Sequence, residues 1–121
     1  MSALDTQVGG NHYKGLPYQP VALNTKLDFN FIQGNIVKYV SRYKNKNGKQ
    51  DLVKAIHYAQ LGQELNPHNF TVLGDSLIKE LHNYVEMNGF SEDISKLLMQ
   101  VVYQDWFEVV VIITNIIKEY D

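Results

Sequence analysis

The sequence predicts an all-α protein: a compact bundle of about five helices preceded by an irregular, glycine-rich N-terminal arm. Apolar residues from position 28 onward recur at the i, i+3, i+4 spacing of amphipathic helices. Turn-forming pairs separate these segments at Asn47-Gly48, Asn66-Pro67 and Asn88-Gly89. The chain has 121 residues, of which 45% are hydrophobic, so we expect a single domain over residues 1–121 with one core.

Residues 1–26 make up the predicted arm. Glycines at positions 9, 10 and 15 and prolines at positions 17 and 20 interrupt regular structure there. The first residues lack the basic and apolar regions of a signal peptide, and the longest apolar run, Val109–Ile113, is too short to span a bilayer. The chain also contains no cysteine, so we expect a cytoplasmic protein without disulfide bonds or a membrane partner.

Residues 27–65 predict a basic helical hairpin. An N-cap aspartate begins its first helix, Asp28–Lys44. Gly34 within this helix lowers helix stability by about 1 kcal/mol relative to alanine, which indicates a close approach at this position by a group that the sequence does not identify. Gly48 suits the positive φ of a turn, and the second helix is expected to run from Gln50–Glu64.

Residues 66–121 predict an acidic half with three helices. These cover Phe70–Met87, a segment that begins at Ser91, and Gln104–Tyr120. The β-branched run Val109–Ile113 in the last segment also suits a buried strand. A helix that is apolar nearly all round is buried on most faces, so we expect this segment to contribute to a homo-oligomer interface.

Three residues are expected to serve packing. Trp106 is assigned to the core rather than to a ligand platform. Gly62 and Gly74 are expected to let helices approach one another closely. The sequence shows no internal repeat.

Positive charge is concentrated in the first half of the chain. Residues 1–60 contain eight lysines and arginines and three acids, a net charge of +5, whereas residues 61–121 contain three lysines and ten acids, a net charge of −7. The basic half is also dense in tyrosine, histidine and glycine. This combination is typical of a site for an anionic ligand with a flat ring, such as a nucleotide.

Candidate ligand-binding residues lie on both helices of the predicted hairpin. Lys38 and Arg42 are four residues apart and therefore neighbours on one helix face, with Asn35 one turn before. Two cations and an amide in a row are suited to hold a phosphate through charge-assisted hydrogen bonds. A solvated basic face, or a lysine lying over a packed tyrosine, has the same spacing. The aromatic and basic neighbours that complete this candidate set are Tyr39, Lys54 and Tyr58.

The arm supplies a second group of candidate ligand-binding residues. Two adjacent glycines allow backbone N–H groups to converge on an anion, and histidine, lysine and tyrosine side chains beside them add donors and a ring. An ordinary loop has the same composition, and the sequence contains no P-loop pattern. These residues are Gly9, Gly10, Asn11, His12, Tyr13 and Lys14.

Catalytic and metal-binding patterns are absent from the sequence. The four histidines show no metal-ligand spacing, and no acidic pair recurs near the basic segment. Asp51 lies at a helix start, where an acid is favoured on structural grounds. We therefore assign no catalytic residue, no metal ligand and no cofactor.

Residues 7–65 carry five short blocks of sequence. They are V-G-G-N-H-Y-K-G (Val8–Gly15), Gln19-Pro20, G-N-I-V-K-Y-V-S-R-Y (Gly34–Tyr43), K-N-G (Lys46–Gly48) and D-L-x-K-A-x-x-Y (Asp51–Tyr58). In these blocks the chain resembles a family of small proteins from tailed phages and prophages. Most of that family has no known function, and its named member is a phage nucleotide kinase that lacks a P-loop. The resemblance implies a phage-encoded, nucleotide-handling helical protein that forms oligomers in the cytoplasm of an infected bacterium.

Two functions are consistent with these residues. The first is a binder that captures a nucleotide or a nucleotide-derived signalling molecule and sequesters it from host defence. The alternative is a small nucleoside monophosphate kinase, which would need two nucleotide sites and usually Mg²⁺ held by carboxylates. We favour the binder because the sequence supplies cations, donors and rings, but no assignable catalytic group. We do not expect nucleic-acid binding, because basic residues are few and the net charge is −2.

Overall fold

The computed structural model describes residues 3, 15–45, 48–65 and 74–120. Regular structure in these residues is entirely helical, without strands, which confirms the predicted all-α class. Six α-helices lie in this part of the chain, one more than expected, together with a 3₁₀ turn at Tyr43–Asn45. The α-helices are α1 (Pro20–Lys26), α2 (Phe31–Arg42), α3 (Lys49–Leu65), α4 (Asp75–Met87), α5 (Glu92–Tyr103) and α6 (Trp106–Tyr120).

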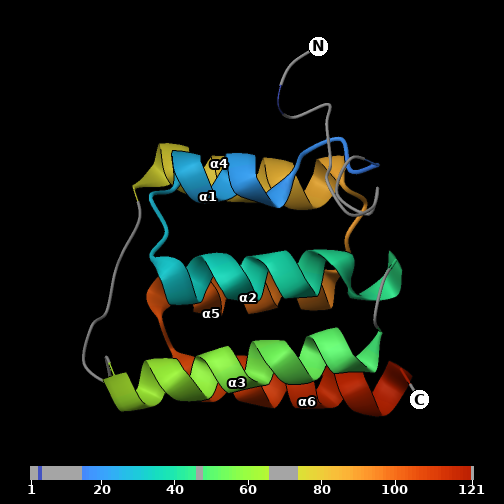
Figure 1. The fold of residues 1–121 in the computed structure, drawn as a ribbon. Helices are drawn as coiled ribbons and strands as arrows, with labels where there is room; N and C mark the ends of the chain where they lie inside the picture. Colours follow the sequence, from blue (N-terminus) through green and yellow to red (C-terminus); the bar gives the residue numbers. More distant parts are fainter. Residues whose placement is uncertain (1–2, 4–14, 46–47, 66–73, 121) are drawn as a thin grey trace.

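The helices form two layers of three (Figure 1). In the first layer α1, α2 and α3 lie next to one another, and α4, α5 and α6 do the same in the second layer. Each helix of the first layer contacts its counterpart in the second: α1 with α4, α2 with α5, and α3 with α6. Paired helices run in opposite directions, because the start of each first-layer helix lies at the end of its counterpart. Tyr18 before α1 bonds to Asn88 after α4, Gln33 in the first turn of α2 bonds to Val101 near the end of α5, and Gly48 before α3 lies against Tyr120 at the end of α6. The two halves thus stack their helices in the same order, with each helix reversed in direction, although their sequences show no repeat.

The prediction of an irregular arm as far as residue 26 was wrong for its last seven residues. Pro20 is the first residue of α1, where its fixed φ suits a helix and its missing N–H costs no hydrogen bond. Leu23 and Leu27 then bury their side chains in the core, which gives this short helix its stability. The proline therefore begins a helix instead of interrupting one.

The predicted N-cap of the next helix was also wrong. Asp28 has a left-handed backbone with φ of 53° and an exposed side chain in the turn between α1 and α2. Asn30 caps α2 instead: its Oδ1 accepts from the Gln33 backbone N–H at 2.8 Å. Gln33 Oε1 in return accepts from the Asn30 backbone N–H at 3.0 Å, which completes a capping box.

The second layer contains the three helices expected there. Ser91 caps α5 through its hydroxyl, as the sequence predicts. The segment Val109–Ile113 lies within α6, so the alternative of a buried strand was wrong. Apolar residues on one face of α6 pack into the core, whereas Phe107 is 69% exposed. No helix in the described ranges has the length and apolar character needed to cross a bilayer.

One core joins the two layers. Trp106 is buried in it, as expected, and its indole ring packs directly on Gly62. Gly74 was assigned a packing role wrongly, since it is the exposed N-cap of α4 and nothing lies within 4 Å of a Cβ built there. The fully buried side chains include Leu23, Ile36, Val37, Val40, Leu52, Leu81, Tyr84, Leu97, Leu98, Val101, Val102 and Ile113.

Candidate functional site

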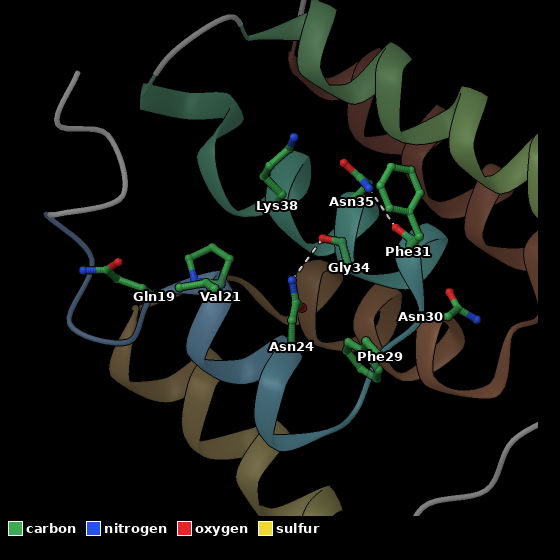
Figure 2. Close-up of a pocket in the computed structure, with 10 residues that line it drawn as sticks. Gln19, Val21, Asn24, Phe29, Asn30, Phe31, Gly34, Asn35 and Lys38 are labelled. Carbon is green, nitrogen blue, oxygen red and sulfur yellow. Dashed lines mark hydrogen bonds between the residues drawn. The ribbon is translucent and has the colours of Figure 1, made fainter. Parts of the chain in front are cut away.

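A hollow of about 360 Å³ lies between α1 and α2, and we call it the α1/α2 hollow. This volume falls within the range of small-molecule sites. Apolar side chains and side-chain amides line it, with one lysine at its edge (Figure 2). The lining residues are Gln19, Pro20, Val21, Asn24, Phe29, Asn30, Phe31, Gly34, Asn35 and Lys38.

The back of the α1/α2 hollow depends on a close approach of its two helices. Asn24 Nδ2 on α1 donates to the Gly34 carbonyl oxygen on α2 at 3.2 Å (Figure 2). A Cβ on Gly34 would lie 3.2 Å from the same nitrogen, so with a larger residue here the Asn24 side chain would have to shift by a few tenths of an ångström. The close approach expected at Gly34 is therefore confirmed. Asn24 Oδ1 is buried without a hydrogen-bond partner in the described part of the chain.

One wall of the hollow is a row of residues on α2. Phe31 is 75% exposed, so most of its apolar ring faces solvent. Asn35 Nδ2 donates to the Phe31 carbonyl oxygen at 2.8 Å, which fixes the amide beside the hollow. Lys38 follows one turn later at the edge (Figure 2). The wall therefore offers an apolar ring, an amide and a cation in sequence.

A cluster of aromatic rings continues this wall onto α3. The rings of Tyr39 and Tyr58 stack with centroids 6.0 Å apart and an interplanar angle of 25°. Phe31 meets Tyr58 edge-on, also at 6.0 Å. Phe31 thus belongs both to the α1/α2 hollow and to this aromatic row, which makes the two features continuous.

Three cations surround the Tyr39 ring. Lys38 Nζ lies 4.5 Å and Lys54 Nζ 5.5 Å from its centroid, and Arg42 Cζ lies 4.8 Å away. Each contact is a cation–π interaction, which holds the positive groups near one another against their mutual repulsion. We use the name basic-aromatic patch for the exposed Phe31 together with four half-buried residues, Lys38, Tyr39, Lys54 and Tyr58.

Arg42, which was predicted to hold a phosphate together with Lys38, forms an ion pair with Asp51. Its Nε donates to Asp51 Oδ2 at 3.1 Å and its Nη2 to Asp51 Oδ1 at 3.2 Å. The two side chains are only 9% and 0% exposed, so the ion pair is buried between α2 and α3. From the sequence, Asp51 was explained only as an acid favoured at the start of a helix. The structure shows that its carboxylate also neutralises the charge of Arg42. In contrast, Lys38 and Lys54 form no ion pair with any described residue.

The structure brings together most of the residues predicted on the hairpin. Asn35 and Lys38 line the hollow, and Tyr39, Lys54 and Tyr58 lie in or beside the basic-aromatic patch. The predicted arm residues Gly9, Gly10, Asn11, His12, Tyr13 and Lys14 lie outside the described residues.

Sequence reasoning missed the contribution of α1 and of Phe31. The hollow requires Pro20, Val21 and Asn24, all of which fell in the segment assigned to an irregular arm. A helix-starting proline followed by an apolar pair was the available signal. No group of three or more acidic or histidine side chains that could hold a metal ion occurs among the described residues.

The candidate site lies in a region of the chain that matches a known family model. Residues 10–60 match the family DUF3310, described as a protein of unknown function. Nothing matched among curated proteins or among solved structures. Within the described part of the chain, the matched residues include α1, α2 and the start of α3 as far as Gln60. The residues that line the hollow and form the patch all fall within this range.

Proposed function

We propose that this protein binds a nucleotide or a nucleotide-derived signalling molecule across the α1/α2 hollow and the basic-aromatic patch. One observation carries the proposal. Lys38 and Lys54, from two different helices and without an acidic partner among the described residues, both approach the ring of Tyr39 beside an apolar hollow.

The physical requirements of such a ligand match the two parts of the site. A base or other flat ring gains binding free energy by packing against apolar and aromatic walls, which Pro20, Phe29 and Phe31 supply. Phosphate oxygens accept charge-assisted hydrogen bonds from ammonium groups that are not already paired with a carboxylate. Lys38 and Lys54 supply such groups within the described part of the chain. Because Asp51 neutralises Arg42, we assign the phosphate contacts to the two lysines and give Arg42 the role of holding α2 against α3.

The biological setting of this proposal rests on the resemblance of the sequence blocks. A phage-encoded binder would keep a nucleotide signal from a host defence system without changing it chemically.

We further propose that the protein forms a homo-oligomer through α6, where Phe107 and Val111 remain exposed one turn apart. Light scattering should give a mass above that of the 13.9 kDa chain, and Phe107→Ser should lower it.

A direct experiment tests the binding proposal. Nucleotides released from the heat-denatured protein are identified by mass spectrometry, and the ligand found is titrated calorimetrically into refolded or ligand-free protein. Lys38→Ala and Lys54→Ala should each weaken binding about tenfold or more, since each removes a charge-assisted hydrogen bond. Lys79→Ala on α4 is the matched control, because it removes an exposed lysine from the other layer. Equal affinities for all four proteins would place the site elsewhere.

The alternative function is a nucleoside monophosphate kinase, which the family resemblance favours. Phosphoryl transfer usually needs carboxylates to position Mg²⁺, and Asp51, the carboxylate beside the patch, is occupied by Arg42. We therefore expect a nucleoside monophosphate and ATP to remain unchanged after incubation with the protein and Mg²⁺. Chromatographic detection of a diphosphate product that Lys38→Ala abolishes would establish the kinase instead.

A further inference from the structure

The two lysines of the candidate site differ in their relation to the α1/α2 hollow. Lys38 on α2 lines the hollow, whereas Lys54 on α3 does not. Both side chains are half-buried, and their Nζ atoms lie 4.5 and 5.5 Å from the centroid of the same Tyr39 ring. A group that leaves the hollow toward α3 therefore meets Lys38 first and Lys54 second.

Aromatic rings connect the hollow with the two lysines. Phe31 lines the hollow and meets the Tyr58 ring edge-on, with centroids 6.0 Å apart. Tyr58 stacks with Tyr39, the ring that both ammonium groups approach. The Lys38 side chain extends from the edge of the hollow away from Asn24 at its back (Figure 2). The site is thus elongated, with an apolar end at α1 and a cationic end at α3.

The buried carboxylate beside the patch does not compensate the charges of the two lysines. Asp51 already accepts from Arg42 Nε at 3.1 Å and from Arg42 Nη2 at 3.2 Å. Two ammonium groups near one ring repel each other, and an anion that contacts both of them relieves this repulsion. The elongated shape favours an anion whose charges also follow one another along a line.

We infer that the ligand is a nucleoside diphosphate or triphosphate, with its phosphates in one chain, and that Lys54 selects it over a monophosphate. This inference rests on the proposed function, because it places the base in the α1/α2 hollow. The phosphate next to the ribose contacts Lys38, and the following phosphate contacts Lys54. Each contact is a charge-assisted hydrogen bond. A monophosphate leaves Lys54 without an anionic partner.

Matched pairs of nucleotides test the inference. The mono- and diphosphates of adenosine, guanosine, cytidine and uridine are titrated calorimetrically into the ligand-free full chain. For a base that binds, the diphosphate should bind about tenfold or more tightly than the monophosphate, because it gains one charge-assisted hydrogen bond. Equal affinities within each pair would overturn the inference and leave the proposed function intact. Absence of binding by all eight nucleotides would count against both.

The two lysines should respond differently to substitution. Lys54→Gln keeps most of the side-chain stem and removes the charge, so the affinity ratio of diphosphate to monophosphate should fall to about one. Lys38→Gln should weaken both members of a pair and keep their ratio, and Lys54→Arg should retain more of the ratio than Lys54→Gln because it keeps a charged donor. Lys79→Gln is the matched control, since it removes an exposed lysine from α4. Equal loss of the ratio in Lys38→Gln and Lys54→Gln would mean that both lysines hold the same phosphate, and the inference would be rejected.

A charge-matched ligand separates the chain geometry from total charge. A nucleoside 3′,5′-bisphosphate carries two phosphates at separate positions of the ribose instead of in one chain. It should bind less tightly than the diphosphate of the same base, and Lys54→Gln should lower its affinity less. If the bisphosphate bound as tightly as the diphosphate and lost as much affinity in Lys54→Gln, total charge would explain the preference and a phosphate chain would not be recognised.

Discussion

The two layers of the bundle stack their helices in the same order but carry different chemistry. The first layer, α1 to α3, contains the α1/α2 hollow, the buried Arg42–Asp51 pair and the basic-aromatic patch. In the second layer α5, the counterpart of α2, buries five apolar side chains and begins with two acids. The spacing of apolar residues thus sets where each helix lies. The candidate binding site is formed instead by residues that face outward or toward a neighbouring helix of the same layer. The halves share an architecture without sharing a site.

The largest expected effect comes from breaking the ion pair inside the first layer. Asp51→Ala leaves Arg42 with an uncompensated buried charge, which should lower the free energy of unfolding by about 3–5 kcal/mol. Lys38→Ala is the matched control: it removes a cation from the same face of α2, and it should change stability by no more than about 0.5 kcal/mol. Urea denaturation followed by circular dichroism measures both. Similar losses for the two variants would mean that Arg42 and Lys38 do not differ as proposed.

This contrast also shows how much of the site the sequence could predict. The i, i+4 spacing correctly predicted that Lys38 and Arg42 share a helix face, and Tyr39 and Tyr58 were correctly grouped with them. Spacing within one helix does not show what lies across a turn, so it could not show that Asp51 neutralises Arg42. The hollow was missed because it depends on contacts between α1 and Gly34, and such contacts leave no periodic signal in the sequence.

The fold was more predictable than the site because it depends mainly on periodicity. The repeated apolar positions in residues 104–120 outweigh the β-branched run Val109–Ile113, since a helix places Trp106, Val109, Ile113 and Ile116 on one buried face. Cap positions were less predictable. Asp28 and Asn30 are both good N-cap residues, and the choice between them depended on Gln33, three residues after Asn30, which completes the capping box.

A smaller effect is expected where the two layers meet at α3 and α6. A Cβ on Gly62 would lie 2.5 Å from Trp106 Cε2, and this ring is buried in the core. Gly62→Ala should therefore destabilise the protein by about 1–3 kcal/mol, despite the higher helix propensity of alanine. Gly74→Ala is the comparison variant, because a Cβ at position 74 has no atom within 4 Å. It should lower the free energy of unfolding by about 1 kcal/mol or less, through the change of the N-cap residue of α4. Thermal unfolding of the two variants should separate them, and a stabilised Gly62→Ala protein would show that the helices shift apart without cost.

The contact between α1 and α4 has a polar centre around Tyr18, just before α1. The Tyr18 hydroxyl donates a short hydrogen bond to Glu80 on α4, and Lys26 Nζ lies 3.1 Å from the same carboxylate oxygen. The side-chain amide of Asn88 pairs with the backbone of Tyr18 at 3.1 and 2.8 Å. These groups hold the start of the first layer onto the second.

The smallest effect concerns pH at this contact. The hydrogen bond from Tyr18, and after it Lys26, holds the pKa of Glu80 below its ordinary value of 4.5. Because the folded pKa is lowered, the contribution of Glu80 to stability is present above pH 4.5 and is lost as pH falls through the lowered pKa. Tyr18→Phe should therefore lower the unfolding temperature at pH 7, and its difference from the parent should shrink in acid. Tyr58→Phe, whose hydroxyl forms no hydrogen bond with a described residue, is the control and should match the parent at both pH values. A deficit in Tyr18→Phe that stays constant from pH 7 into acid would show that ring packing, and not the bond to Glu80, joins the layers here.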